Sequence, residues 1–297
     1  MDTGSRMTEK SLTQQVNSVL ATLTDDIKNN KLELPSPPDI LIKVRSVTSS
    51  PNTTIDHIVE LVNQDPHISG RLIKVANCAL FGSRNHVSSV KSAISRLGLP
   101  RVQNLIVGLS IAQNIMKSKT QGLEQHFNQS WQLSNRVAAI SYVLAQHKSD
   151  IDPEQALLAG MVHNIGTLPL VLRLNHIPEL KTNAKVLTMV ADVVIPKLYP
   201  KAGKLVMESW NFSPDIANIA LSHCDLHRES DGAVSLDDIV LIAHQLSTLD
   251  DYTLIENKRP ELIDSSIFKK LWTSREEAEA ELNNYREEID QMKQDIS

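Results

Sequence analysis

Residues 64–82 read QDPHISGRLIKVANCALFG. The pair Asp65-Pro66 is a typical helix start, because aspartate caps the exposed N–H groups of a first turn and proline fits the first helical position. Four apolar residues follow at helical spacing: Leu72, Ile73, Ala76 and Leu80. This spacing predicts a helix that begins at Pro66 and buries one face.

Similar start and stop signals recur along the chain. Helix starts are expected at Ser36-Pro37-Pro38-Asp39, at the capping box Thr53–Asp56, at Ser89, Pro100, Pro153 and Ser213-Pro214, and at the capping box Ser235–Asp238. Gly98 is expected to end one of these helices in a left-handed conformation. Aromatic residues make up 4% of the chain and alternating β-branched runs are scarce, which argues against a large sheet. The sequence therefore predicts an all-α fold.

The two ends of the chain differ from this helical body. We expect an amphipathic helix within residues 1–31, a body at 32–250 with lobes at 32–125 and 126–250, and a C-terminal helix within 251–297. Apolar residues of the last segment recur at spacings of four and three: Ala278, Leu282, Tyr285, Ile289, Met292 and Ile296. This heptad seam predicts a helix that either docks on its own domain or pairs with a second copy as a homodimer.

Composition narrows the class of protein further. The chain has 297 residues, a formal net charge of −5, 41% hydrophobic residues and 22% charged residues, all ordinary for a globular protein. We find no signal peptide core and no long uncharged apolar run, so neither membrane insertion nor secretion is expected. The two cysteines, Cys78 and Cys224, form no CxxC pair and are typical of reduced thiols. These features predict a cytoplasmic protein.

Charge is distributed unevenly along the chain. Residues 66–123 hold no Asp or Glu but eight basic residues, whereas residues 275–297 carry a net charge of −5. Six of these basic residues form a candidate partner-binding surface: Arg71, Lys74, Arg84, Lys91, Arg96 and Arg101. The stretch is either an ordinary solvated surface or a docking site for an acidic partner. The acidic C-terminal segment, of the same chain or of a second copy, is one candidate for that partner. Nucleic acid is not the expected partner, because the chain carries a formal net charge of −5 and few aromatic residues for stacking are interleaved with these cations.

Several ordered motifs resemble the HDOD family. They are the stretch 64–82, the upstream Leu34-Pro35-Ser36-Pro37-Pro38, the downstream Val87-Ser88-Ser89-Val90, Ala93-Ile94, Leu97-Gly98 and Asn104-Leu105, and the segment Ala159-Gly160-Met161-Val162-His163-Asn164-Ile165-Gly166. The resemblance covers roughly residues 32–250. It implies a two-lobed helical bundle similar to the HD-domain phosphohydrolases, with extra helices at both ends.

The resemblance also identifies the residues where related HD enzymes hold metal ions with histidines and aspartates. The His-Asp pair of those enzymes stands here as His163-Asn164, the later paired histidine as His223-Cys224, and the closing Ala-Asp as Ala243-His244. Tyr199 lies where a further histidine is common, and no histidine stands at 131–134. Three imidazoles are therefore present at these positions, and neither carboxylate is.

This residue set argues against ordinary HD chemistry. Asn164 carries no charge and accepts no proton at neutral pH, and His244 replaces a further carboxylate by a neutral ligand. A site of His163, His223 and His244, with or without Cys224, would suit Zn²⁺ or Ni²⁺ better than Mg²⁺ or Mn²⁺. Alternatively, the three histidines are core residues bonded to carbonyls or to hydroxyls such as that of Tyr199. In that case no cofactor is expected.

The sequence leaves two classes of function open. The first is a non-catalytic regulatory module of a bacterial signalling pathway, which acts through contacts with signalling proteins. The second is a metal-dependent phosphohydrolase, a phosphatase or phosphodiesterase, that works with altered ligands. Fold alone does not decide between them.

Overall fold

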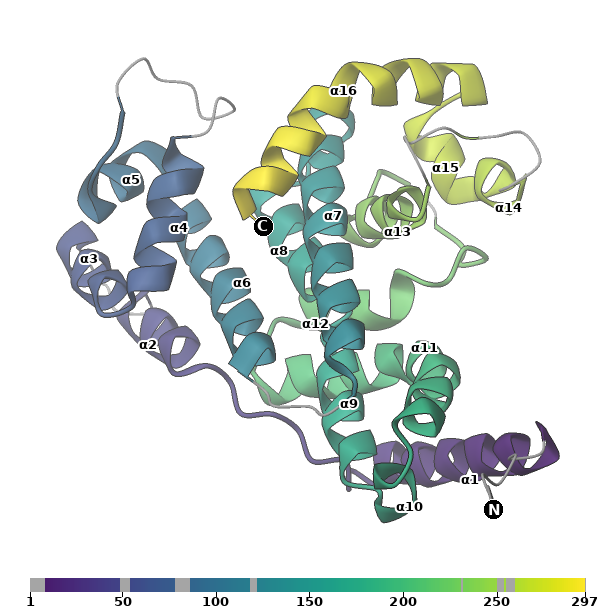
Figure 1. Cartoon of the computed structure of the whole chain (residues 1–297). Coiled ribbons are helices and arrows are strands. Elements are labelled where there is room, and N and C mark those ends of the chain that lie inside the picture. The colour runs from purple at the N-terminus through teal and green to yellow at the C-terminus, as the bar shows by residue number, and fades with distance from the viewer. Residues whose placement is uncertain are drawn as a thin grey trace, which may run out of the picture. The chain divides into compact units, whose positions relative to one another are not determined.

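The structure is a computed structural model and describes residues 9–48, 54–77, 86–117, 122–230, 232–249, 254 and 260–296. Every regular element in these residues is an α-helix (Figure 1), which confirms the predicted fold class. The contacts divide the chain into two units. Unit 1 comprises Met1–Ser36, Ser118–Ser130 and Asn164–Leu221, and unit 2 comprises Pro37–Lys117, Trp131–His163 and Ser222–Ser297. The units thus interleave along the chain, whereas the lobes predicted at 32–125 and 126–250 are contiguous.

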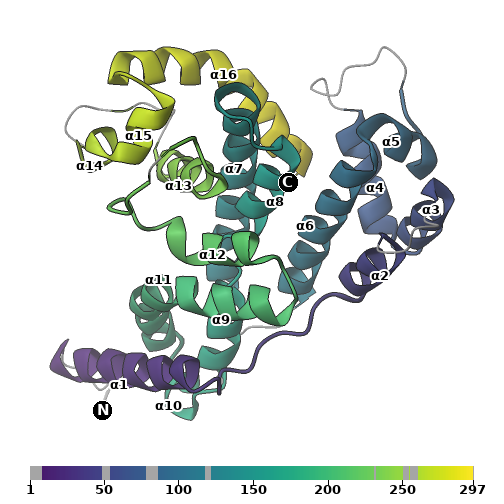
Figure 2. The same ribbon diagram turned by 180° about the vertical axis from the view of Figure 1, so that it is seen from behind.

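Unit 1 is built around one long helix. Its helices are α1 (Glu9–Lys28), α9 (Thr167–Asn175), α10 (Pro178–Lys181), α11 (Ala184–Ser209) and nearly all of α12 (Pro214–Ser222), together with the first turns of α7 (Glu124–Lys148). Helix α11 packs against α9 and α1, and both views show α1 alongside it (Figure 1 and Figure 2). The N-terminal amphipathic helix is therefore docked on unit 1 through its apolar face, on which Val19, Leu23 and Ile27 are buried.

Unit 2 holds the remaining helices and most of the helix starts that the sequence predicts. They are α2 (Asp39–Thr48), α3 (Ile55–Asn63), α4 (Pro66–Ala76), α5 (Val90–Leu97), α6 (Leu99–Lys117), the rest of α7, α8 (Pro153–Val162), α13 (Leu236–Ser247), α14 (Pro260–Asp264), α15 (Ser266–Leu271) and α16 (Arg275–Ile296). Helices α3, α4 and α5 pack on one another, and α8 packs between α6 and α13. The contact of α8 with α13 positions the candidate site.

The predicted helix ends are mostly where the sequence places them. Asp65 accepts hydrogen bonds from the first-turn N–H groups of α4, and Ser235 forms a capping box with Asp238 at the start of α13. Gly98 ends α5 with φ +82°, a region that favours glycine. The capping box predicted at Thr53 is wrong by one residue, because Thr54 is the N-cap of α3. Leu80, predicted on the apolar face of α4, lies outside the described residues.

The heptad seam of α16 is buried within its own chain. Its core side chains are at most 1% exposed: Ala278, Leu282, Ile289, Met292 and Ile296. Tyr285 stacks on the ring of His147 in α7 with a centroid distance of 4.5 Å, and Lys148 forms an ion pair with Glu281 at 2.8 Å. Of the two interpretations of this helix, docking on its own domain is the one that the structure shows. A dimer through this seam would require α16 to leave its place.

One segment of the described chain, residues 153–175, is long and apolar enough to span a membrane by composition. The expectation that the chain has no long uncharged apolar run is wrong for this segment, because residues 155–172 contain no Asp, Glu, Lys or Arg. Its most apolar window is 89% buried inside the protein. Such burial is typical of core helices, so this segment gives no reason to expect a membrane span.

Candidate functional site: a histidine cluster in unit 2

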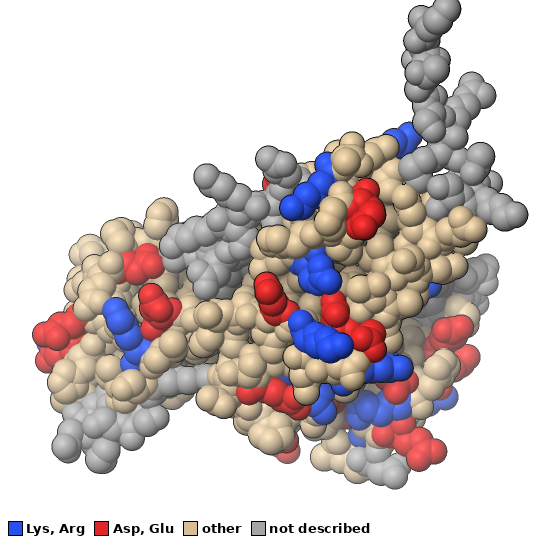
Figure 3. Space-filling view, turned by 90° about the horizontal axis from the view of Figure 1, so that it is seen from below, with Lys and Arg blue, Asp and Glu red and all other residues tan. Residues whose placement is uncertain are grey.

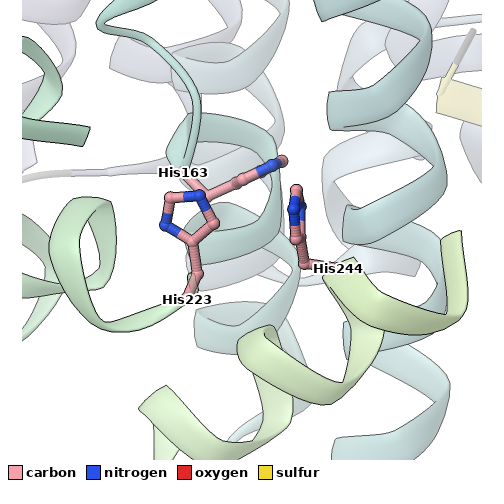
Figure 4. A group of neighbouring side chains, drawn as sticks. All are labelled: His163, His223 and His244. Carbon is pink, nitrogen blue, oxygen red and sulfur yellow. The ribbon is translucent and has the colours of Figure 1, made fainter. Parts of the chain in front are cut away.

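His163, His223 and His244 meet in unit 2, as Figure 4 shows. His163 directly follows α8, His223 directly follows α12, and His244 lies in the last turn of α13. The ring centroids are 4.9 to 5.3 Å apart, and each pair of rings meets edge to face. One ring nitrogen of each histidine lies within 4.8 Å of the other two. This is the one group of three or more His, Cys, Asp or Glu residues with metal-binding spacing in the part of the chain that the structure describes.

Helix α8 can approach α7 closely because residue 160 is a glycine. A Cβ atom at Gly160 would lie 2.5 Å from Cα of Ala138 in α7, which is too close for any side chain. The carbonyl of Gly160 accepts a hydrogen bond from Nδ1–H of His163 at 2.7 Å. The glycine therefore allows the helix contact and presents the carbonyl that fixes the ring of His163.

The position of His223 is fixed through its neighbour in the chain. The hydroxyl of Ser222 donates a hydrogen bond to the carboxylate of Asp237, in the first turn of α13. This bond holds the end of α12 beside the helix that carries His244. Sequence reasoning did not identify it, because it joins two residues whose proximity depends on the packing of unit 2.

His163 is fully buried and neutral. Burial, together with the neighbouring rings of His223 and His244, holds the pKa of His163 well below its usual range. Since Nδ1 carries the proton that is donated to Gly160, Nε2 carries the lone pair, and this buried atom has no hydrogen-bond partner. A neutral imidazole whose second nitrogen is fixed by a backbone carbonyl is the form in which histidine binds metals.

Cys224 lies next to the cluster and at the protein surface. Its Sγ is 3.0 Å from Nε2 of His223, while the residue itself is exposed. Both His163 and His223 are fully buried, and His244 is partly exposed. The cluster thus has a buried side formed by imidazoles and an accessible side with a thiol.

The two other residues predicted at the site, Asn164 and Tyr199, belong to unit 1. The side-chain amide of Asn164 donates a hydrogen bond to the carbonyl of Ser130 at 2.9 Å. The residue that stands in place of the HD carboxylate therefore makes a backbone contact within unit 1. Tyr199 lies inside α11 and is partly exposed.

The described residues of the candidate partner-binding surface have partners within the chain. Arg71 and Lys74 donate to the carbonyls of Ile296 and Gln294 at the C-terminal end of α16, at 3.1 and 2.8 Å. Such contacts are favourable because the C-terminal end of a helix carries partial negative charge. The other three contacts are Lys91 with Asp56, Arg96 with the carbonyl of Ala76, and Arg101 with Glu154 and Tyr142. Arg84 lies outside the described residues.

These contacts favour an intramolecular role for the basic stretch. Two of its cations hold the acidic C-terminal helix, which agrees with the interpretation that the tail is their partner in the same chain. On the face drawn in Figure 3, basic and acidic side chains are interspersed, with no large area of one sign among the coloured residues.

A buried carboxylate network in unit 2 was not predicted from the sequence. Asp238 is fully buried and forms ion pairs with Arg228 and with Lys270, the latter at 3.1 Å. Burial raises the pKa of Asp238, but hydrogen bonds from its neighbours outweigh this effect and lower the pKa to about 2. The donors are Ser235, Ser230, Lys270 and Arg228. The network links α13, α15 and the loop after α12, and so supports the elements that carry His223 and His244.

Comparison with known proteins identifies the family. The sequence model of the HDOD domain matches residues 34–226. An "Uncharacterized protein" of Treponema pallidum (strain Nichols) is 24% identical over 222 residues, which are 71% of this chain, and the chain covers 41% of that protein's length.

Solved structures share the fold. A "Putative metal-dependent phosphohydrolase" from Shewanella amazonensis SB2B has a TM-score of 0.78 and 24% identity, over 96% of this chain and 100% of that one. An HDOD domain protein with unknown function from Geobacter sulfurreducens has a TM-score of 0.67 and 18% identity, over 96% and 98%. A "Putative signal transduction protein" from Marinobacter aquaeolei VT8 has a TM-score of 0.57 and 20% identity, over 100% and 69%. The family match spans well over half of the chain, and this protein therefore belongs to the HDOD family.

Proposed function

We propose that this protein is a non-catalytic regulatory module of a bacterial signalling pathway and that it acts through contacts with other proteins. One observation carries the proposal: the histidine cluster contains three imidazoles and no carboxylate. Hydrolysis of a phosphate ester at a metal centre needs a strongly charged metal site and a base that accepts a proton. Neutral imidazoles supply neither a negative charge nor a carboxylate base.

The position of the missing carboxylate supports the same proposal. Asn164 stands where the HD pair has its aspartate, and its amide is engaged with the carbonyl of Ser130. The name of the Marinobacter structure, a "Putative signal transduction protein", is consistent with a signalling role. That likeness establishes the fold, and the role is part of our proposal.

The alternative is a metal-dependent phosphohydrolase with altered ligands. It is favoured by the close approach of three imidazoles, and by the name of the Shewanella structure, a "Putative metal-dependent phosphohydrolase". A bound metal ion would supply Lewis-acid chemistry there, held by His163, His223 and His244. The donor set fits a soft divalent ion such as Zn²⁺ better than Mg²⁺.

Turnover of phosphate esters distinguishes the two functions. The purified full chain is assayed with p-nitrophenyl phosphate, bis-p-nitrophenyl phosphate and cyclic dinucleotides, each with Mg²⁺, Mn²⁺, Zn²⁺ or Ni²⁺. His163→Ala removes a buried member of the cluster, and His86→Ala changes an exposed histidine as the matched control. We expect no turnover above the protein-free rate. Metal-dependent turnover that His163→Ala abolishes and His86→Ala retains would establish the alternative.

A further inference from the structure

Cys224 lies beside the histidine cluster, outside the group of three ring nitrogens that lie within 4.8 Å of one another. Cys224 directly follows His223, and its Sγ lies 3.0 Å from Nε2 of that histidine. Figure 4 shows the three rings converging on one another from three separate segments of unit 2. The thiol approaches this group from its accessible side, since Cys224 is exposed while His163 and His223 are fully buried.

The three ring nitrogens have a spacing from which a tetrahedral metal site can form. Zinc bonds of about 2.0–2.1 Å to nitrogen and about 2.3 Å to sulfur place the ligand atoms about 3.3–3.6 Å apart. The ring nitrogens lie within 4.8 Å of one another, and the Nε2–Sγ distance is 3.0 Å. The three imidazoles therefore lie close to the spacing of zinc ligands, and Cys224 has to turn toward His163 and His244 to complete a tetrahedral site.

On the buried side of the cluster, Nε2 of His163 has a lone pair that can bind a ligand. Nε2 of His163 is buried without a hydrogen-bond partner, and an unpaired buried acceptor is unfavourable. This atom cannot be satisfied by a change of tautomer without losing the hydrogen bond from Nδ1 to the carbonyl of Gly160. A cation with affinity for nitrogen satisfies it directly.

We propose that Cys224 is the fourth ligand of a closed zinc site built on His163, His223 and His244. Zinc sites with three protein ligands keep one position open and serve catalysis, whereas sites with four protein ligands are closed and structural. The thiol loses its proton to solvent on binding, and the thiolate supplies the one negative charge that the imidazoles lack. This assignment rests on the proposed non-catalytic function. The fourth coordination position of the metal ion, which a hydrolase would keep open for water or substrate, is filled by sulfur.

Cobalt substitution tests the proposal, because Co²⁺ occupies zinc sites and reports its ligands by absorption. The metal-free full chain is titrated with Co²⁺, and the near-ultraviolet thiolate-to-cobalt band is recorded with the visible bands. We expect one cobalt per chain with a thiolate band in the wild type and in Cys78→Ala, which changes the other cysteine. Cys224→Ala should lose the thiolate band and bind Co²⁺ at least about tenfold more weakly.

The wild type provides a second readout that needs no variant. Bound Zn²⁺ should slow the alkylation of Cys224 by iodoacetamide at least about tenfold, because a coordinated thiolate is withdrawn from reaction. Mass spectrometry of peptides follows Cys224 and Cys78 separately within one sample, so Cys78 serves as the internal reference.

The cobalt and alkylation experiments test the role of Cys224, and the turnover assay tests the proposed function separately. Cobalt bound without a thiolate band, cobalt not bound at all, or alkylation of Cys224 that zinc does not slow would each overturn the role of Cys224. If the assays also show no phosphate-ester turnover, the non-catalytic function stands while the fourth ligand is rejected. A thiolate band together with metal-dependent turnover would leave Cys224 as a ligand and reject the non-catalytic function.

Discussion

Replacement of Asp238 by asparagine should destabilise unit 2, and the pH dependence of the effect identifies its cause. The carboxylate is fully buried and contacts two cations, Arg228 and Lys270, whose side chains are 25% and 12% exposed. Its pKa is lowered from 3.8 to about 2 in the folded protein. At about 1.4 kcal/mol per pKa unit, this difference corresponds to about 2 kcal/mol of folding free energy at neutral pH.

The direction of the pH dependence follows from the lower pKa in the folded state. The stabilisation by the carboxylate is fully present above the unfolded-state pKa of 3.8 and is lost as the pH falls through about 2. Asp238→Asn retains a side chain of the same shape, but no longer offsets the charges of Arg228 and Lys270. The free energy of unfolding of the variant should therefore fall below that of the wild type by about 2 kcal/mol at pH 7, and the gap should narrow below pH 4.

Urea unfolding followed by far-ultraviolet circular dichroism, at pH values from 7 to 3, measures this difference. Asp150→Asn is the matched control, because Asp150 is exposed, and it should change stability by less than about 0.5 kcal/mol. If Asp238→Asn is as stable as the control at pH 7, or if the gap does not change on acidification, the carboxylate does not stabilise unit 2 in the way argued.

Two further substitutions test the packing that places the candidate site and the C-terminal helix. Gly160→Ala should lower the free energy of unfolding in urea by at least about 2 kcal/mol, because its Cβ would lie 2.5 Å from Cα of Ala138. Gly70→Ala is the control: no atom lies within 4 Å of the new Cβ, so it should raise the free energy of unfolding by about 0.5–1 kcal/mol, and equal effects of the two substitutions would contradict the close helix contact. Ile289→Ala in the buried seam of α16 should lower the free energy of unfolding by about 2–4 kcal/mol. Glu287→Ala, on the exposed side of the same helix, should lower it by less than about 0.5 kcal/mol. If Ile289→Ala does not change stability, α16 is not docked in solution.

Local signals predicted many of the helices, because caps act over only a few residues. Asp65 with Pro66, and Ser235 with Asp238, satisfy the N–H groups of a first turn whatever surrounds the helix. The same reasoning places Thr53 one residue too early, since two adjacent threonines offer equivalent hydroxyls and only the packing of α3 selects Thr54. Element boundaries of this kind are decided by neighbours that the sequence does not show.

Helix α11 was not predicted, because its own sequence contradicts it. Pro196 and Pro200 lie inside a helix of 26 residues, although each removes a backbone hydrogen bond and crowds the preceding turn. Pro196 is exposed, while Val190, Val194 and Leu198 are buried on the opposite side. Burial of this apolar side against α9 and α1 offsets the cost of the prolines, and that gain comes from elements distant in the sequence.

The candidate site was predictable only through the family resemblance. Position by position, the resemblance singled out His163, His223 and His244, and the structure brings these three together. The contacts that hold them could not be read from the sequence. Gly160 against Ala138, Ser222 with Asp237, and Asp238 with its two cations each join residues from separate segments.

A metal ion at the histidine cluster would need a negatively charged ligand. A divalent cation among neutral imidazoles requires negative charge nearby, because a buried charge without compensation is costly. The buried carboxylate of Asp238 is engaged with Arg228 and Lys270, and the buried carboxylate of Glu154 with Arg101. The carboxylate of Asp237 accepts a hydrogen bond from Ser222. On our proposal, the thiol of Cys224, which lies 3.0 Å from Nε2 of His223, supplies the charge. On the same proposal, the lack of a carboxylate in the histidine cluster and the thiol beside it belong together, because three imidazoles and one thiolate form a closed site for a soft ion such as Zn²⁺.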